Sequence, residues 1–154
     1  MSTNLLLVSP YNVNFYGGVQ NQVNQFKNNL DSSKFNVRIL APDSSDYDIG
    51  KSLRIPFNGS NNPISLLPNK QILNEAIAWA DIIHIHEPFI PLFFWRLKSS
   101  KKIIVTHHAK ISKFIYFGLK FLYLTLRNKN FYSTAVSDEA KANALTLSKK
   151  TRII

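Results

Sequence analysis

The sequence predicts an α/β fold: a Rossmann-like, doubly wound and mostly parallel sheet with helices on both faces. Apolar runs of strand length alternate along the chain with segments whose apolar residues recur at helical spacing. The strands are continuously apolar, which is typical of parallel strands buried on both faces. The connections are short, and right-handed crossovers between parallel strands then place helices on both sides of the sheet.

Most of the expected strands end at a proline or at a polar residue. The first is the run Leu5-Leu6-Leu7-Val8, and the second is stopped by Pro42. In chain order, the expected strands are 5–9, 35–42, 53–57, 81–88, 101–108, 132–137 and 151–154. The acidic stretch 43–48 and the stretch 58–63 are expected to be loops.

Helices are expected between these strands. The apolar face of the first is formed by Val19, Val23, Phe26 and Leu30, at spacings of four, three and four. The second, 70–79, carries Ile72, Leu73, Ala76, Ile77 and Ala80 on one side. Three more helices are expected at 91–98, 111–127 and 138–147. Ser137 and Asp138 form a typical N-cap for the last of them.

The composition limits the classes of protein to consider. At 154 residues, with 45% hydrophobic and 18% charged residues, the chain fits one globular domain. It has no cysteine, which excludes a disulfide framework and a thiolate zinc site. Neither a signal peptide nor an apolar stretch of membrane-spanning length is recognisable, so we expect a cytoplasmic protein. The net charge of +10 favours an anionic partner: nucleic acid, an acidic lipid surface or a phosphorylated ligand.

Polar residues gather where the expected strands end. They are Tyr11, Gly17-Gly18, Phe57-Asn58, His86-Glu87, His107-His108 and Ser137-Asp138. In parallel sheets the carboxyl ends of the strands meet at one edge, and ligands bind outside that edge. This convergence predicts a binding site there.

The glycine pair Gly17-Gly18 lies between the first strand and the first helix, in a chain with only five glycines. Glycine tolerates unusual backbone angles and lets a ligand approach the backbone, and a helix N-terminus attracts anions. The pair is therefore a candidate phosphate cradle. A tight turn without a ligand explains it equally well. Neither the dinucleotide fingerprint nor a nucleotide-triphosphate loop is present.

The stretch PYNVNFYGGVQNQV, residues 10–23, resembles the opening loop of retaining GT-B glycosyltransferases of family 4, especially the phosphatidylinositol mannosyltransferase type. That type reads Pro-Tyr-…-Pro-Gly-Gly-Val-Gln-x-His-Val. The stretches that agree in order are LAP (40–42), IPFNGS (55–60), HIHEP (84–88), VTHHA (105–109) and AVSD (135–138). The sequence departs from the pattern at Tyr16 (proline in the family), Gln22 (histidine) and His107 (another aromatic).

The resemblance implies a two-domain enzyme in which the N-terminal domain holds the acceptor. The C-terminal domain holds most of a nucleotide-diphosphate sugar, the donor substrate. Residues 1–154 would form a single acceptor-side domain without its donor-binding domain, and no tightly bound cofactor is expected. The resemblance implies a catalytic role for His108 and contact of Gly17 and Gly18 with the donor diphosphate. The implied acceptor contacts are Tyr11, Gln20, Asn58 and Lys113, with Phe57, His86, Glu87 and His107 as further pocket candidates.

Two of these regions have competing interpretations. His84 and His86 lie on one face of a strand, as half of a metal site would, but no third ligand follows at a suitable spacing. We therefore expect no metal, and His84 fits a core histidine with satisfied hydrogen bonds. Glu87 fits either a sugar contact or a cap on a neighbouring backbone group.

The segment 110–129 predicts a helix that is apolar nearly all round. Its charged side chains, Lys113, Lys120 and Arg127, recur every seven residues and form one narrow stripe. One interpretation is an interfacial helix on an anionic membrane, with these three residues at the head groups. The other is a core helix between the sheet and the second domain.

The expected function is sugar transfer, with a phospholipid or another anionic compound as the candidate acceptor at the inner face of the cell membrane. The chain alone is expected to be inactive, and a separate chain is one source of the donor-binding domain. The alternative is a non-catalytic lipid- or phosphate-binding remnant of the same fold. Nucleic acid is not an expected partner, because the basic residues are dispersed and no recognition module is present.

Overall fold

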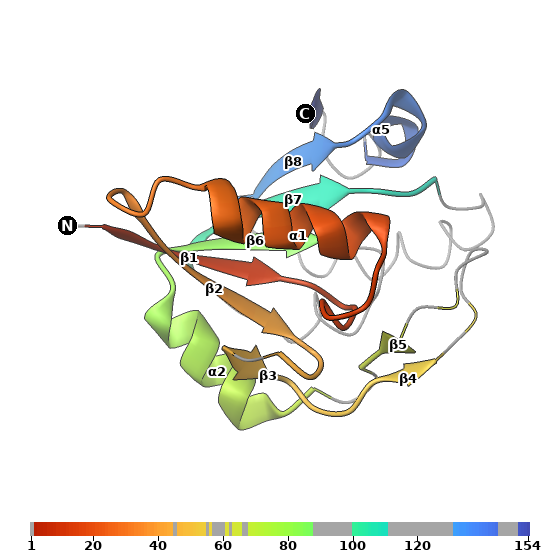
Figure 1. The fold of residues 1–154 in the computed structure, drawn as a ribbon. Helices are drawn as coiled ribbons and strands as arrows, with labels where there is room; N and C mark the ends of the chain where they lie inside the picture. Colours follow the sequence, from red (N-terminus) through yellow and green to blue (C-terminus); the bar gives the residue numbers. More distant parts are fainter. Residues whose placement is uncertain are drawn as a thin grey trace.

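The computed structural model describes residues 2–44, 46–54, 56, 61, 63–65, 68–87, 100–110, 131–144 and 151–154. Its main sheet has seven strands in the order β3-β2-β1-β6-β7-β8-β9, and all their pairings are parallel (Figure 1). The strands are β1 (Thr3–Val8), β2 (Phe35–Ala41), β3 (Tyr47–Asp48), β6 (Ile82–His86), β7 (Lys102–His107), β8 (Phe131–Ala135) and β9 (Thr151–Ile153). The helices are α1 (Gly18–Asn29), α2 (Lys70–Trp79) and α5 (Asp138–Ala144). This confirms the predicted Rossmann-like α/β fold.

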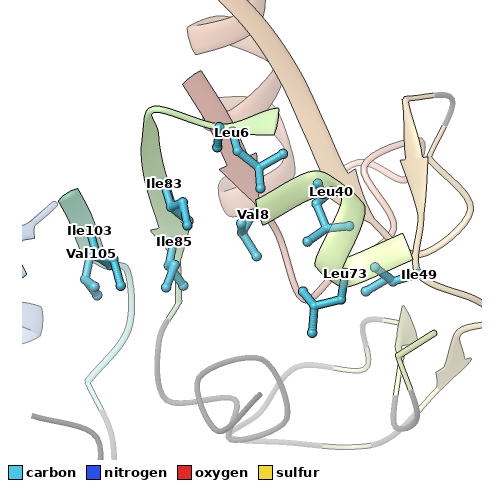
Figure 2. Packing of buried hydrophobic residues seen from close by; sticks show 11 residues of the cluster. Leu6, Val8, Leu40, Ile49, Leu73, Ile83, Ile85, Ile103 and Val105 are labelled. Atoms are coloured by element: carbon cyan, nitrogen blue, oxygen red, sulfur yellow. The ribbon is translucent and has the colours of Figure 1, made fainter. Parts of the chain in front are cut away.

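Helices α1 and α2 cover opposite faces of the sheet (Figure 1). Alternate side chains of β1 point into the two apolar cores on opposite faces of the sheet. Leu6 and Val8 belong to one core, and Leu5 and Leu7 belong to the other. The first core contains Leu40, Ile49, Leu73, Ile83, Ile85, Ile103 and Val105, and Figure 2 shows these side chains, with Leu73 coming from α2 and the strand residues from neighbouring strands. The second contains Val23, with Val19, Phe26 and Leu30 of the predicted apolar face of α1 packed against it.

Three short strands differ from the expected pattern. Strand β3 lies in the stretch 43–48 that was expected to be a loop. The expected strand 53–57 is described only as β4 (Leu53–Arg54), which pairs antiparallel with β5 (Pro63–Ile64) outside the main sheet. Two-residue strands carry no hydrophobic periodicity, so a sequence pattern cannot reveal them. The expected helices 91–98 and 111–127 lie outside the described residues.

Helix α2 begins at a side-chain cap. Asn69 Oδ1 accepts hydrogen bonds from the backbone N–H groups of Gln71 and Ile72, at 3.0 and 3.3 Å. We expect Asn69→Ala to lower the free energy of unfolding by about 1 kcal/mol, because two helix donors lose their acceptor. Urea denaturation measures this loss. The exposed neighbour Lys70→Ala serves as the control, and an equal effect of both substitutions would contradict the capping role.

Candidate functional site

A cleft of about 460 Å³ opens at the carboxyl ends of the central strands. Strand β1 has β2 on one side and β6 on the other. The strands that follow β1 are therefore added first on one side of it and then, from β6 on, on the other side. Ligands of doubly wound folds bind at such a switch point. The cleft lining includes five of the predicted site residues: Tyr11, Gly18, Gln20, Glu87 and His108. Four separate segments of the chain therefore meet as the sequence pattern predicted.

Tyr11 follows β1 and is 7% exposed. Its backbone N–H donates to Ser9 Oγ at 3.1 Å, and its backbone forms a bridge with Ile64 of β5. Burial raises the pKa of the Tyr11 phenol well above its ordinary value, and the nearby Glu87 carboxyl adds to this effect. Tyr11 is thus a neutral hydroxyl group that can donate a hydrogen bond.

The two glycines differ in what surrounds them. A Cβ atom on Gly17 would lie 2.3 Å from Gln20 Oε1, and the Gln20 side chain is fully buried. A Cβ atom on Gly18 would meet nothing within 4 Å. Neither glycine lies in the left-handed region, since Gly17 is extended and Gly50 is the one described glycine with a φ in that range. Packing therefore explains Gly17, whereas the space beside Gly18 is open to a ligand.

The N-terminus of α1 carries little of its own to neutralise it. Its N-cap, Gly17, makes no side-chain cap hydrogen bond, and its first turn carries no acidic residue. The positive end of the helix dipole lies at Gly18, in the lining of the cleft. This arrangement suits a phosphate group.

Glu87 follows β6 with a left-handed backbone, at a φ of 54°. Its N–H donates to Thr106 O at 2.9 Å, and its carboxyl accepts the backbone N–H groups of His108 and Ala109. The side chain is 4% exposed, and burial raises its pKa to about 8 against the opposing effect of those two hydrogen bonds. Glu87 thus caps the backbone that follows β7 and also lines the cleft, so both of its proposed roles remain compatible with the structure.

Three imidazole rings extend from the core to the cleft on the α1 face of the sheet. The ring centroids of His84 and His86 are 4.3 Å apart, and those of His86 and His108 are 5.3 Å apart. His86 Nδ1 lies 3.1 Å from His108 Nε2. His84 Nε2 lies 2.7 Å from Thr106 Oγ1, so His84 is a core histidine with a hydrogen-bond partner. Burial lowers the pKa of His84 and of His108 to about 4 and holds that of His86 well below its ordinary value.

Two pocket candidates do not line the cleft. His86 is fully buried behind His108. His107 is also fully buried, and alternation along β7 places it on the α2 face with Ile103 and Val105. His107 and His108 therefore lie on opposite faces of the sheet, because neighbouring residues along a strand alternate in direction, and a role for His86 or His107 in the pocket stays a prediction. Phe57, Asn58, Lys113, Lys120 and Arg127 lie outside the described residues.

The polar face of α1 contributes residues that the sequence analysis did not select. Asn21, Gln22 and Gln25 line the cleft together with Gly18. They follow Gly18 at intervals of three and four residues, which is the spacing of one helix face. That spacing in the sequence could have identified these three residues as neighbours of Gly18. Ala109 and Val136 also line the cleft, and no sequence pattern marks them.

Comparison with known proteins shows the family of this chain. A model of Glycosyltransferase Family 4 matches residues 16–152. The chain is 30% identical over 121 residues to the phosphatidyl-myo-inositol mannosyltransferase of Mycobacterium leprae (strain TN), which covers 70% of this chain and 32% of that protein. It is 34% identical over 119 residues to the enzyme of that name from Mycolicibacterium smegmatis (strain ATCC 700084 / mc(2)155), covering 70% and 31%. The chain spans about a third of the length of these curated relatives.

Members of family 4 in general use nucleotide-sugar donors. The matched residues include the loop at Gly17 and Gly18 and helix α1. They also include strand β6, which precedes Glu87, and strand β7, which precedes His108, but not strand β1. Because the family model covers most of the sequence, this protein belongs to glycosyltransferase family 4.

Proposed function

We propose that this chain is the acceptor-side domain of a retaining, nucleotide-sugar-dependent glycosyltransferase whose acceptor is an inositol phospholipid. The observation that carries the proposal is the cleft, in which Tyr11, Gly18, Gln20 and His108 meet. The names of the two mannosyltransferase relatives supply the acceptor and sugar class to be tested. The net charge of +10 supports an anionic acceptor.

In this proposal each cleft residue has a separate task. Gly18, at the positive end of α1, faces the donor diphosphate and stabilises the charge that develops on it. Tyr11 and Gln20 hold the acceptor head group, and His108 lies at the reacting centre. The bond from the sugar C1 to the diphosphate oxygen breaks, and a new C1–O bond forms to the acceptor hydroxyl. The hydroxyl proton passes to the departing diphosphate.

The carboxyl groups argue against glycoside hydrolysis. Glu87 is the one carboxyl group in the described lining of the cleft, and two backbone N–H groups already bind it. Most glycosidases need a pair of carboxyl groups on either side of the scissile bond. Transfer on one face of the sugar, without a protein nucleophile, fits the described residues better.

The donor-binding half belongs to the proposal as well. The curated relatives are about three times as long as the part that this chain matches. We propose that a second Rossmann-like domain, in a longer chain or a partner chain, holds the nucleotide and completes the site. In the described part of the chain, no helix is long and apolar enough to cross a membrane.

Vesicle binding tests the acceptor assignment. We expect the chain to bind phosphatidylcholine vesicles that contain phosphatidylinositol more tightly than vesicles with the same fraction of phosphatidylglycerol, which has the same charge. Tyr11→Phe should weaken the phosphatidylinositol binding about tenfold, because one hydrogen bond to the head group is lost. Co-sedimentation measures both effects.

The control is Asn28→Ala, an exposed position of α1 outside the cleft. It should leave both affinities unchanged. Equal binding to the two anionic lipids would contradict head-group recognition and favour the alternative of a peripheral, non-catalytic lipid binder.

A further inference from the structure

We propose that His86 is a positioning residue that fixes the tautomer of His108, so that His108 meets its ligand as a hydrogen-bond donor through Nδ1. The identity of the ligand that His108 meets rests on the function proposed above. The tautomer itself is a property of the protein alone.

The first observation is the contact between the two rings. His86 Nδ1 and His108 Nε2 are 3.1 Å apart, which is the length of a hydrogen bond. A neutral imidazole has one donor and one acceptor nitrogen, so only one of these two nitrogens carries the proton. Burial disfavours the charged form of both rings, which keeps them neutral at pH 7.

The second observation decides which ring donates. His86 Nε2 is fully buried and has no hydrogen-bond partner among the residues that the structure describes. If His108 donated, His86 would carry its proton on Nε2, and a buried N–H would be left without an acceptor. Unpaired buried N–H groups are rare, and unsatisfied acceptors are less so. The favoured arrangement therefore has His86 Nδ1–H donating to His108 Nε2, which places the proton of His108 on Nδ1.

The third observation is that His86 is held in place. Its side chain is fully buried between Phe26 and His84, with ring centroids 5.8 and 4.3 Å away. A ring packed on two sides cannot rotate to release His108 without disturbing the core. His86 is thus a rigid support for the histidine that lines the cleft.

The consequence concerns the chemistry available to His108. Its Nε2 is occupied, so Nδ1 is the nitrogen with which it can bind a ligand. A protonated Nδ1 donates to an oxygen atom, such as a sugar hydroxyl or a phosphate oxygen, and cannot remove a proton. The structure assigns His108 the role of a hydrogen-bond donor and excludes a general base in this state.

Nitrogen-15 NMR of the histidine rings tests the proposal on the chain without ligand. We expect the His108 signals of a protonated Nδ1 and an unprotonated Nε2 at pH 7, and a protonated Nδ1 in His86. In His86→Leu the fixed form should give way to a mixture of both tautomers. His86→Asn, whose amide nitrogen can occupy the position of Nδ1, should restore the fixed form.

His107→Leu is the matched control, because it removes a buried ring from the opposite face of the sheet and leaves Phe26, His84 and His86 in place. It should leave the His108 tautomer unchanged. A protonated Nε2 on His108 in the unaltered chain would overturn the proposal, and this result needs no variant to fold. An unchanged tautomer in a folded His86→Leu variant would overturn it too. Failure of the vesicle experiment would refute the acceptor assignment and leave this result standing.

Discussion

Mild acid should destabilise this protein strongly, because three buried histidines and the half-buried His108 are held in their neutral form. Burial lowers the pKa of His84 and His108 to about 4 and that of His107 to about 3, and it holds that of His86 well below its ordinary value. In the unfolded chain these groups take up protons near pH 6.5. As the pH falls below 6.5, the unfolded state binds more protons than the folded state, so stability is lost until the pH reaches the folded pKa.

The size of the effect is large compared with the stability of a typical domain. At pH 5, each histidine with a folded pKa near 4 or lower costs about 2 kcal/mol. Glu87 acts in the opposite direction. Its pKa is raised to about 8, so its contribution to stability is lost as the pH rises from about 4.5 to 8 and returns on acidification. The three histidines with a folded pKa of about 3 to 4 together cost roughly 6 kcal/mol between pH 7 and 5, and Glu87 reduces the net loss to about 3 kcal/mol, against a usual total stability of about 5–15 kcal/mol.

Urea denaturation at pH 7, 6 and 5, followed by circular dichroism, measures this loss. His107→Leu provides a matched variant, because His107 lies on the apolar α2 face and does not line the cleft. It should reduce the loss between pH 7 and 5 by about 2 kcal/mol. A free energy of unfolding that stays constant over this range would show that the histidines are charged, or exposed, in the folded protein.

Substitution of Gly18 by alanine should stabilise the chain and yet greatly slow sugar transfer. A Cβ atom at Gly18 meets no protein atom within 4 Å, and alanine favours a helix over glycine by up to about 1 kcal/mol. The same methyl group occupies the space at the N-terminus of α1 where we place the donor diphosphate. Displacing the diphosphate there should lower the transfer rate by about 100-fold or more.

Gly17→Ala is the contrasting variant. Its Cβ atom would overlap the buried Gln20 side chain at 2.3 Å, so we expect a loss of about 1–3 kcal/mol of stability. Thermal unfolding of the chain separates the two variants. Transfer is measured with a labelled nucleotide-diphosphate mannose, in membranes that contain the donor-binding half. Full transfer activity in a stable Gly18→Ala variant would refute the diphosphate assignment.

The sequence predicted α1 and α2 well because each of them buries a periodic apolar face. The spacing of Val19, Val23, Phe26 and Leu30 matches α1, and the helix expected at 70–79 agrees with α2 in its bounds. The proposed cap at Ser137 is confirmed, since Ser137 Oγ accepts from Ala140 N at 3.2 Å. Strands β3, β4 and β5 have two residues each and depend on their partners rather than on their own sequence.

The candidate site was predictable in part. Residues that end strands were expected to meet at one edge, and Tyr11, Glu87 and His108 do line one cleft. Adjacent residues of one motif need not share a site. His107 and His108 are neighbours in the sequence, but side chains of successive strand residues point to opposite faces of the sheet. The contact between His86 and His108 joins residues 22 positions apart, and only the register of β6 against β7 brings them together. No local pattern contains that register.

The parallel pairing of β1 with β6 also has a consequence for synthesis on the ribosome. Leu5 pairs with Ile82, about 77 residues later in the chain. At 5–20 residues per second, roughly 4–15 seconds pass between the emergence of these two strands. During this interval β1 presents one unpaired, apolar edge to the cytosol, where it can pair with another nascent chain. Chaperones that bind short apolar segments of the chain during synthesis should therefore raise the yield of folded protein more than chaperones that act after the chain has left the ribosome.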